Sequence, residues 1–513
     1  MVQRRELLRG ALGALAAAAV APPGESAKAQ GSVQEQGVPF TRDGLLARAR
    51  DFLKQPFAAP SAELPDYFAR LTREQFEATE LLPEARVWAS ERKNFTIEPL
   101  LRGWVYGAPV KIFLVDGGKA ELLRPASQQY SFGSQKPPDR LPESAFAGFR
   151  VWPSFAAGQT APGAACLQFL GANFYRAKAA GQRKWGVTAR GLSIRTADPG
   201  EEYPVFREFY VETPPAGEDT LVIHALLDSA SVVGVYTFTL RTNEATILDV
   251  ELTLLPRVEL DHIGLASLAG ASFFTPLDQR RLDDIRPAAS EMNGLQIHTG
   301  GNEWLWRPLS NRNSLQFSSF IDANPKGFGF LTRNRDIAAY QDDDEHWEQR
   351  PSIWIEPHHD WGEGSVQLVE IPSESELNQN IVAYWRPKDR LAANSEKKFA
   401  YRQFWCWSPP TRPPLAVVSA ARSGRGALPK HRRFVVVFSG EALGDPARPP
   451  AQASLSAKPG SFLKLHDEFD PASKTHRVVF ELDPNGETFS ELRLELKVGE
   501  EKVSESWIYR WTL

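Results

Sequence analysis

The sequence predicts a mainly β protein built from two β-sandwich domains. From about residue 95 onward, short alternating runs such as VKIFLVD and YTFTLRTN follow one another, separated by Gly, Pro and Asn. This succession of strands and turns is typical of a large sandwich rather than of βαβ units. A chain of 513 residues with 42% hydrophobic content is long enough for more than one domain, and its 30 Phe, 14 Trp and 11 Tyr suit strands.

The N-terminal 29 residues read as an export signal. A basic start with the pair Arg4-Arg5 precedes an apolar run from Ala11 to Ala21, and Ala27-Lys28-Ala29 supplies an A-x-A cleavage site. The apolar run is too short to span a bilayer. We therefore expect a twin-arginine signal peptide over residues 1–29 and a periplasmic location in a Gram-negative bacterium.

The remaining chain divides into a large and a small domain. Residues 40–90 carry helical spacing, as in PDYFARLTREQFEATELL, and open a domain predicted over 30–407. A Pro- and Arg-rich stretch, 408–433, reads as a linker or loop. Residues 434–513 supply at least five short strands and predict an immunoglobulin-like sandwich, whose first strand can begin near residue 413.

Charge and composition exclude several classes of function. The formal net charge of −4 shows no basic excess, so no nucleic-acid partner is expected. Cys166 and Cys406 allow either one disulfide or two buried thiols, and both remain open. Nine scattered histidines show no ligand spacing, and the adjacent pair His358-His359 fits a turn, so no metal and no cofactor is expected.

Aromatic and charged residues concentrate between residues 291 and 385, where six Trp lie between Trp304 and Trp385. Aromatic rings stack on pyranose rings, while Arg and carboxylate groups bond the hydroxyls, so the group favours a polysaccharide-binding cleft. For any single Trp, a place in the core is the simpler interpretation. The predicted substrate-binding residues are Trp304, Trp306, Arg307, Trp347, Arg350, Trp354, Tyr384 and Trp385.

Many runs along the mature chain resemble one family, the osmoregulated periplasmic glucan biosynthesis proteins G and D (OpgG/OpgD, formerly MdoG/MdoD). The runs are FAGFRVW (146–152), FLGANFYRA (169–177), WGVTARGLSIRTA (185–197), EEYPVFREFYVE (201–212), ALLDSASVVGVYTF (225–238), NEWLWRPLSN (302–311), NPKGFGFL (324–331), QRPSIW (349–354), VEIP (369–372), NIVAYWRP (380–387) and SESWIYRW (504–511). The twin-arginine signal resembles the D-type member more. The resemblance implies a galactose-mutarotase-like sandwich followed by an immunoglobulin-like domain, and a role with the β-1,2-linked glucose backbone of periplasmic glucans.

Some members of the family resemble inverting glycoside hydrolases, which need a general acid and a general base. The resemblance places the base-side aspartate in a run of the form R-P-x-L-H-D-S-N-G-L. Here the run is RPAASEMNGL (286–295), and Glu291 occupies that position as the candidate base. Glu keeps the charge but reaches one methylene further, and a solvated loop carboxylate is the alternative interpretation.

The acid-side aspartate of the family lies in a run like E-T-x-D-N-I-V, which here reads SELNQNIV (375–382). Gln379 stands in its place, and an amide cannot act as a general acid. Losing such an acid costs about 10²–10⁴ in rate. Glu376 is the candidate relocated acid, and Glu374 is a second carboxylate on the same loop.

Three hypotheses follow. The chain binds β-1,2-glucan without cutting it, hydrolyses or transfers glucan with a relocated acid, or serves as a scaffold for a membrane glucan synthase through its immunoglobulin-like domain. The loop SAARSGRGALPKHRRF (419–434) is short and basic. The resemblance to the family implies a longer loop at this place in the hydrolytic members, where it helps to close the cleft. The expected partner is β-1,2-glucan or nascent periplasmic glucan, and the membrane glucan synthase and a second copy of the chain are further candidates.

Overall fold

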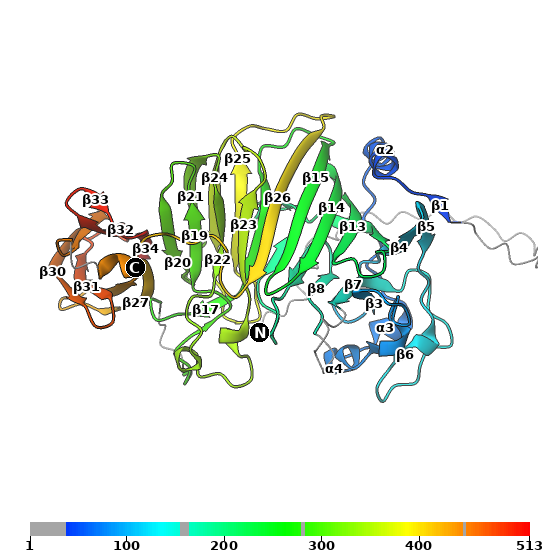
Figure 1. The fold of residues 1–513 in the computed structure, drawn as a ribbon, viewed down its shortest axis with the longest axis horizontal. Coiled ribbons are helices and arrows are strands. Elements are labelled where there is room, and N and C mark those ends of the chain that lie inside the picture. The colour runs from blue at the N-terminus through cyan, green and yellow to red at the C-terminus, as the bar shows by residue number, and fades with distance from the viewer. Residues whose placement is uncertain (1–36, 154–163, 279–282, 445–447) are drawn as a thin grey trace, which may run out of the picture.

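The computed structural model describes residues 37–153, 164–278, 283–444 and 448–513, and these form a mainly β protein (Figure 1). The predicted fold class is therefore confirmed at this level. The predicted signal peptide lies outside the described residues. Among the helices of the described ranges, none is long and apolar enough to cross a membrane.

Two sheets form the body of the molecule, and we call them the large sheet and the small sheet. The large sheet has 16 strands in the order β1 (Val38–Pro39), β5 (Lys119–Leu122), β4 (Lys111–Asp116), β12 (Val205–Glu212), β13 (Thr220–Asp228), β14 (Val232–Thr242), β15 (Thr246–Pro256), β26 (Lys397–Cys406), β23 (Ser352–Pro357), β22 (Gly327–Leu331), β19 (Gly294–His298), β20 (Trp304–Pro308), β34 (Ser506–Thr512), β32 (Phe489–Val498) and β29 (Gln452–Lys458), with β33 (Glu501–Lys502) beside β32.

The small sheet has 10 strands in the order β21 (Gln316–Ala323), β24 (Glu363–Glu370), β25 (Ile381–Pro387), β16 (Ile263–Gly270), β10 (Thr188–Arg190), β9 (Phe174–Ala177), β8 (Leu167–Leu170), β7 (Phe146–Pro153) and β3 (Phe95–Leu101), with β11 (Ser193–Ile194) beside β16. One face of each sheet supplies the shared core, because alternate residues of a strand point to one face. The Gln403 amide donates to the Tyr175 hydroxyl at 2.8 Å and ties the two layers together.

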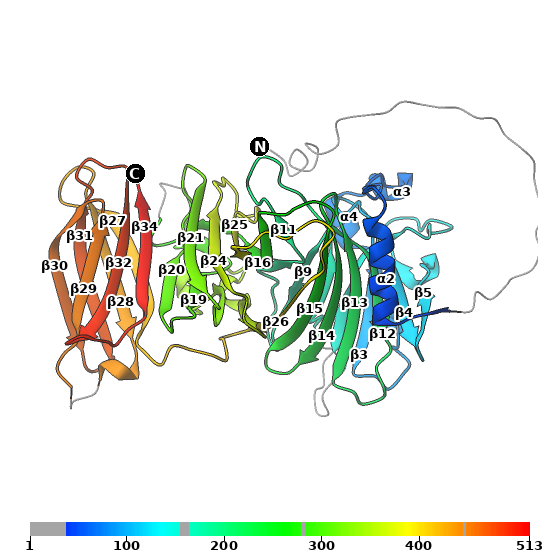
Figure 2. The same cartoon turned by 90° about the horizontal axis from the view of Figure 1, so that it is seen from above.

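Short helices cover the N-terminal end, as the spacing in residues 40–90 predicts. Helix α2 (Arg42–Leu53) begins at Thr41, whose hydroxyl accepts from the Gly44 N–H at 3.0 Å, and packs on the outer face of β13, β14 and β15 through Leu45 and Ala49 (Figure 2). The other short elements are α3 (Asp66–Ala69), α4 (Arg73–Glu77), η1 (Pro83–Ala85), η2 (Ser127–Gln129), η3 (Ile337–Ala339), η4 (Trp347–Gln349), η5 (Glu441–Leu443) and the pairs β2 (Glu80–Leu81) with β6 (Tyr130–Ser131) and β17 (Ser272–Phe274) with β18 (Ala289–Ser290).

The C-terminal unit, residues 417–512, is a second two-layered sandwich. Its C-terminal sheet has 4 strands in the order β27 (Val417–Arg425), β28 (Arg432–Ser439), β31 (Thr475–Asp483) and β30 (Ser461–Asp470), and its other layer is β34, β32 and β29. Phe434 stacks on Phe480 at 5.1 Å in the core of this unit. Strand β27 lies inside the range predicted as a linker, 408–433, and the connection without a strand is 407–416. The immunoglobulin-like and galactose-mutarotase-like assignments stay predictions.

A continuous sheet joins the C-terminal unit to the body. Strands β20 and β34 pair in parallel, with Leu305 opposite Ser506 and Trp306 opposite Trp507. Next to this seam the fully buried Glu505 carboxylate accepts two bonds from the Arg333 guanidinium, at 2.5 and 2.8 Å, one from the Gln296 amide at 2.9 Å and one from the Val418 N–H at 2.8 Å. The two units are therefore fixed to each other by backbone pairing and a saturated buried carboxylate.

The two cysteines are free and buried, which settles the open alternative in favour of two thiols. Burial raises the pKa of each thiol to about 12, so both stay protonated and unreactive at neutral pH. His358 and His359 lie in a bend after β23, as expected.

Candidate functional site

The outward face of the small sheet carries a row of polar side chains. Register places Glu98 of β3 opposite Arg150 of β7, Arg150 opposite Gln168 of β8, and Gln168 opposite Arg176 of β9. Their neighbours Ile97, Phe149, Leu167 and Tyr175 point into the core, so the polar residues all lie on the opposite face. Glu98 and Gln168 are buried at 4% and 1% exposure, whereas Arg150 and Arg176 are partly exposed, and we call this row the platform.

Glu291 is fixed at one edge of this platform, directly after β18. Its backbone N–H donates to the Ala271 carbonyl at 2.9 Å, and the Ala271 N–H donates to its Oε2 at 3.0 Å. The Arg350 guanidinium donates to its Oε1 at 2.6 Å, and both side chains are buried. Each carboxylate oxygen keeps a further acceptor position, so the group can still take a bond from water or a hydroxyl.

Gln379 is linked to the same short stretch of backbone through Thr188, whose hydroxyl also lies 3.3 Å from the Ala269 carbonyl oxygen. The Gln379 side-chain oxygen accepts from the Thr188 hydroxyl at 3.0 Å, and Thr188 lies opposite Ala269 in the ladder of β10 and β16. The next residue, Asn380, exchanges two bonds with the backbone of Ser272, at 2.9 and 3.0 Å. The two positions that the family resemblance singles out, Glu291 and Gln379, thus converge on residues 269–272.

Glu376 belongs to a separate charged cluster beside the platform. The Arg286 guanidinium donates to Glu376 at 2.6 Å, to Asp342 at 2.7 Å and to Asp284 at 2.8 Å. Burial would raise the pKa of Asp342, but bonds from Arg286, the Glu345 N–H and the Trp347 indole outweigh it and lower that pKa to about 2. In this cluster the Glu376 carboxyl group accepts a hydrogen bond from Arg286, which is the opposite of the donor role that a general acid plays.

A chain of contacts joins the two clusters. Arg350, which holds Glu291, lies over the Trp347 ring at 4.0 Å, and the Trp347 indole donates to Asp342 at 2.9 Å. Asp342 in turn holds Arg286 and, through it, Glu376. The loop 371–380 is therefore braced against the segment that positions Glu291.

The predicted substrate-binding residues are all buried. Their exposed fractions are Trp304 5%, Trp306 3%, Arg307 1%, Trp347 2%, Arg350 7%, Trp354 0%, Tyr384 1% and Trp385 0%. Two of them contact other residues of the protein: Arg307 pairs with Glu370 at 2.9 Å, and the Trp304 ring stacks on the His298 ring at a centroid distance of 3.9 Å. In this conformation the rings pack, and their direct contact with sugar stays a prediction.

Other aromatic rings, which the sequence analysis did not single out, remain half-buried near the platform. They are Trp104, Tyr106, Trp152 and Trp185. Arg86 lies over the Trp152 ring at 3.6 Å, and Lys178 lies over Trp185 at 4.5 Å. These rings lie between residues 104 and 185, whereas the Trp residues concentrated between residues 304 and 385 are buried. The concentration of Trp in the sequence therefore does not indicate which rings are accessible.

Comparison with known proteins decides the family. A model described as "Periplasmic glucan biosynthesis protein, MdoG" matches residues 40–511. The chain belongs to the MdoG family.

Relatives of this family match along nearly the whole chain. Glucans biosynthesis protein G of Rhodopseudomonas palustris is 38% identical over 98% of this chain and 99% of its own length. The protein of the same name from Bradyrhizobium diazoefficiens is 38% identical over 100% of both chains, and that of Vibrio cholerae is 37% identical over 92% of this chain and 87% of its own. The closer resemblance to the D-type member depended on residues 1–29 and stays a prediction.

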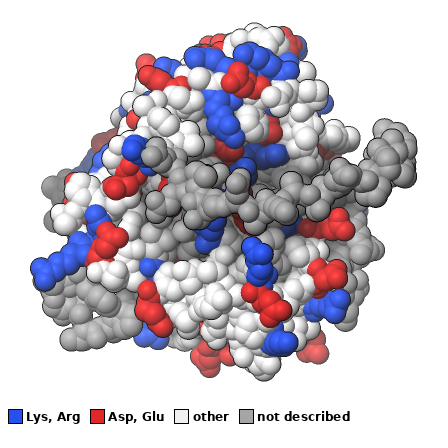
Figure 3. All heavy atoms as spheres, turned by 90° about the vertical axis from the view of Figure 1, so that its right-hand side faces the viewer, with Lys and Arg blue, Asp and Glu red and all other residues white. Residues whose placement is uncertain are grey.

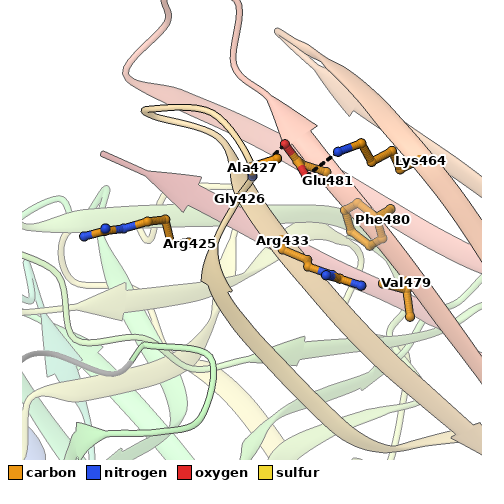
Figure 4. Close-up of a pocket in the computed structure, with 8 residues that line it drawn as sticks. All are labelled: Arg425, Gly426, Ala427, Arg433, Lys464, Val479, Phe480 and Glu481. Carbon is orange, nitrogen blue, oxygen red and sulfur yellow. Dashed lines mark hydrogen bonds and ion pairs between the residues drawn. The ribbon is translucent and has the colours of Figure 1, made fainter.

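Three further observations concern other places where a ligand or an ion could bind. A cavity of about 240 Å³ lies in the C-terminal unit, where Lys464 reaches toward Glu481 and Arg425 points away from both (Figure 4), so it contains none of the predicted site residues. Among the described side chains visible in Figure 3, acidic and basic groups are mixed without a large patch of one sign. In the described ranges, no group of three or more His, Cys, Asp or Glu is placed to hold a metal ion.

Proposed function

We propose that this chain takes part in the biosynthesis of periplasmic glucans by holding a β-1,2-linked glucan over the outward face of the small sheet. Membership of the MdoG family and the names of its relatives support the biological role. The observation that carries the site is the convergence of Glu291 and Gln379 on residues 269–272, next to the polar row and the half-buried rings.

The chemistry of the two positions favours binding over cleavage. An inverting hydrolase needs a proton donor on one side of the scissile bond and a carboxylate that activates water on the other. Gln379 has no titratable proton to donate. Glu291 is fixed by Arg350 and by the Ala271 N–H, so its carboxyl oxygens can accept from a sugar hydroxyl, and the half-buried rings can stack on pyranose faces.

An active hydrolase or transglycosylase is the second candidate. It is favoured by the place of Glu376, three residues before Gln379 on the same loop, with its side chain 26% exposed. For this role Glu376 would have to leave Arg286 and gain a proton when glucan binds. The non-catalytic scaffold for a glucan synthase is the third, and the C-terminal unit would be its contact surface.

One set of measurements separates these candidates. Purified mature protein is titrated with linear β-1,2-glucan by calorimetry, and reducing ends are followed during long incubation. The variants are Gln379→Asp, Glu291→Gln and Glu376→Gln, with Glu374→Gln as the matched control, because Glu374 is an exposed carboxylate on the same loop.

Binding without cleavage, together with new hydrolysis in Gln379→Asp that is lost again in the double variant with Glu291→Gln, supports the binding protein. Wild-type cleavage that disappears in Glu376→Gln but not in Glu374→Gln supports the enzyme. Absence of glucan binding would overturn both and leave the scaffold.

We also propose export to the periplasm by the twin-arginine route, because Arg4-Arg5, the apolar run and the A-x-A site stand in the required order. Replacing both arginines by lysine is expected to leave the protein in the cytoplasmic fraction on cell fractionation. Unchanged periplasmic recovery would contradict this route.

A further inference from the structure

Two basic side chains at the end of β9 share one aromatic ring. Arg176 and Lys178 alternate with the core residues Tyr175 and Ala177, so both point to the outward face of the small sheet. The Arg176 guanidinium lies 4.9 Å and the Lys178 ammonium 4.5 Å from the centre of the Trp185 ring. Two cations and one half-buried ring thus meet on the platform.

Neither cation forms an ion pair with a carboxylate of the described residues. Arg176 donates from Nε to the Gln168 side-chain oxygen at 2.8 Å, and no other bond of its side chain is formed within these ranges. Lys178 is only 7% exposed, which is unusual for a lysine without a charged partner. A desolvated ammonium of this kind costs free energy unless something supplies negative charge.

Neighbouring cations on the same platform are compensated. Arg150 pairs with Glu98 at 3.1 Å, and Arg350 pairs with Glu291 at 2.6 Å. Both nearby carboxylates are therefore already engaged. The pKa of Lys178 is lowered to about 8, first by burial and then by the positive charge of Arg176, as expected where no anion balances the pair.

We propose that Lys178 and Arg176, with the ring of Trp185 beside them, form a subsite for an anionic group carried on the glucan, a carboxylate or a phosphate ester. The guanidinium and ammonium bond the anion, and the indole faces the sugar that carries it. The proposal rests on glucan binding at this face and specifies which glucans the chain prefers. A free small anion offers the same charge, so the experiment must distinguish the two sources.

The test compares three ligands by calorimetry: a neutral linear β-1,2-gluco-oligosaccharide, the same oligosaccharide carrying one carboxymethyl group, and inorganic phosphate alone. We expect wild type to bind the carboxymethylated ligand about tenfold more tightly than the neutral one, since a charge-assisted bond contributes this much. Lys178→Met keeps the length of the stem and should abolish the preference, so that the neutral and carboxymethylated oligosaccharides bind with affinities within about twofold of each other. Lys398→Met, an exposed lysine on β26, is the control and should behave as wild type.

Equal affinity of wild type for the neutral and anionic oligosaccharides would overturn the proposal, as would a preference that survives in Lys178→Met. Phosphate bound as tightly as the carboxymethylated oligosaccharide would assign the charge to a free anion and also overturn it. If the neutral oligosaccharide binds normally in these cases, the proposed glucan binding stands and only the anion subsite fails. If neither oligosaccharide binds, glucan binding itself fails.

Discussion

Two regions of the molecule differ in whether a buried charged group is paired with a group of opposite charge. At the seam between the body and the C-terminal unit, Glu505 is fully buried and receives four bonds, and Arg307 is paired with Glu370 nearby. On the outward face of the small sheet, Lys178 is almost as buried, yet no carboxylate of the described residues pairs with it. At the seam the buried charges are balanced within the fold, whereas the Lys178 ammonium is not balanced by a carboxylate of the described residues, and this difference underlies the anion subsite proposed there.

This difference gives substitutions opposite expected effects in the two regions. Removing one member of a buried pair leaves an uncompensated charge and destabilises strongly. Removing a buried charge that has no partner removes its unfavourable desolvation free energy from the folded state. Stability and binding measurements on the same set of variants can therefore test the comparison.

The largest effect is expected at the seam. Glu505→Gln leaves the Arg333 guanidinium without its carboxylate, and breaking a buried pair in this way costs about 3–5 kcal/mol of unfolding free energy. Urea unfolding followed by tryptophan fluorescence measures it, with Glu500→Gln, an exposed neighbour in sequence, as the control. A loss of unfolding free energy below about 1 kcal/mol would show that the buried Glu505 pair contributes little to stability, and would contradict the comparison between the seam and the platform.

An intermediate effect with a defined pH dependence is expected at Asp342. Its pKa is about 2 in the folded protein, below the value of about 3.9 for an unfolded chain. The contribution is therefore fully present above about pH 4 and is lost as the pH falls toward 2. Asp342→Asn should lower unfolding free energy by about 2 kcal/mol at pH 7 and by much less near pH 2.

Unfolding curves at both pH values check this prediction. The exposed neighbour Asp343 offers a matched control, Asp343→Asn, which should change stability little at either pH. A pH-independent loss in Asp342→Asn would indicate that packing, and not the ion pairs with Arg286, accounts for the effect.

The smallest effect on stability is expected on the platform. Lys178→Met keeps the apolar stem over Trp185 and removes a desolvated charge, so unfolding free energy should stay the same or rise by about 1 kcal/mol. The same urea titration measures it. A clear loss of stability would show that Lys178 has a structural partner and would weaken the contrast between the regions.

Much of the fold follows from the sequence, because alternation of apolar and polar residues reports strands directly. The strands of the body were predicted in this way, and the helical spacing within residues 40–90 predicted the short helices there. The predicted linker contains β27, because its Ser, Gly and Arg residues sit on an exposed strand and carry no apolar alternation. Parallel pairing of β20 with β34 joins segments about 200 residues apart, which no local pattern can reveal.

The site was predicted less completely. Glu291 and Gln379 came from the resemblance to a family, and the structure brings them to one stretch of backbone. The choice of aromatic rings failed to find the accessible ones, because both faces of strands such as β20 and β23 are covered, and alternation then says nothing about which ring meets solvent. Lys178 gave no sequence signal, since a lysine after a strand usually lies in solvent.

The pairing of β20 with β34 also governs which strand edges of the protein are exposed while it folds. Until β34 is in place, β20 presents an unpaired edge of the large sheet, and β32 presents another. Open edges of this kind invite pairing between chains. Residues 506–512 therefore act as the closing strand for both units, and their removal is expected to cause aggregation through these two edges.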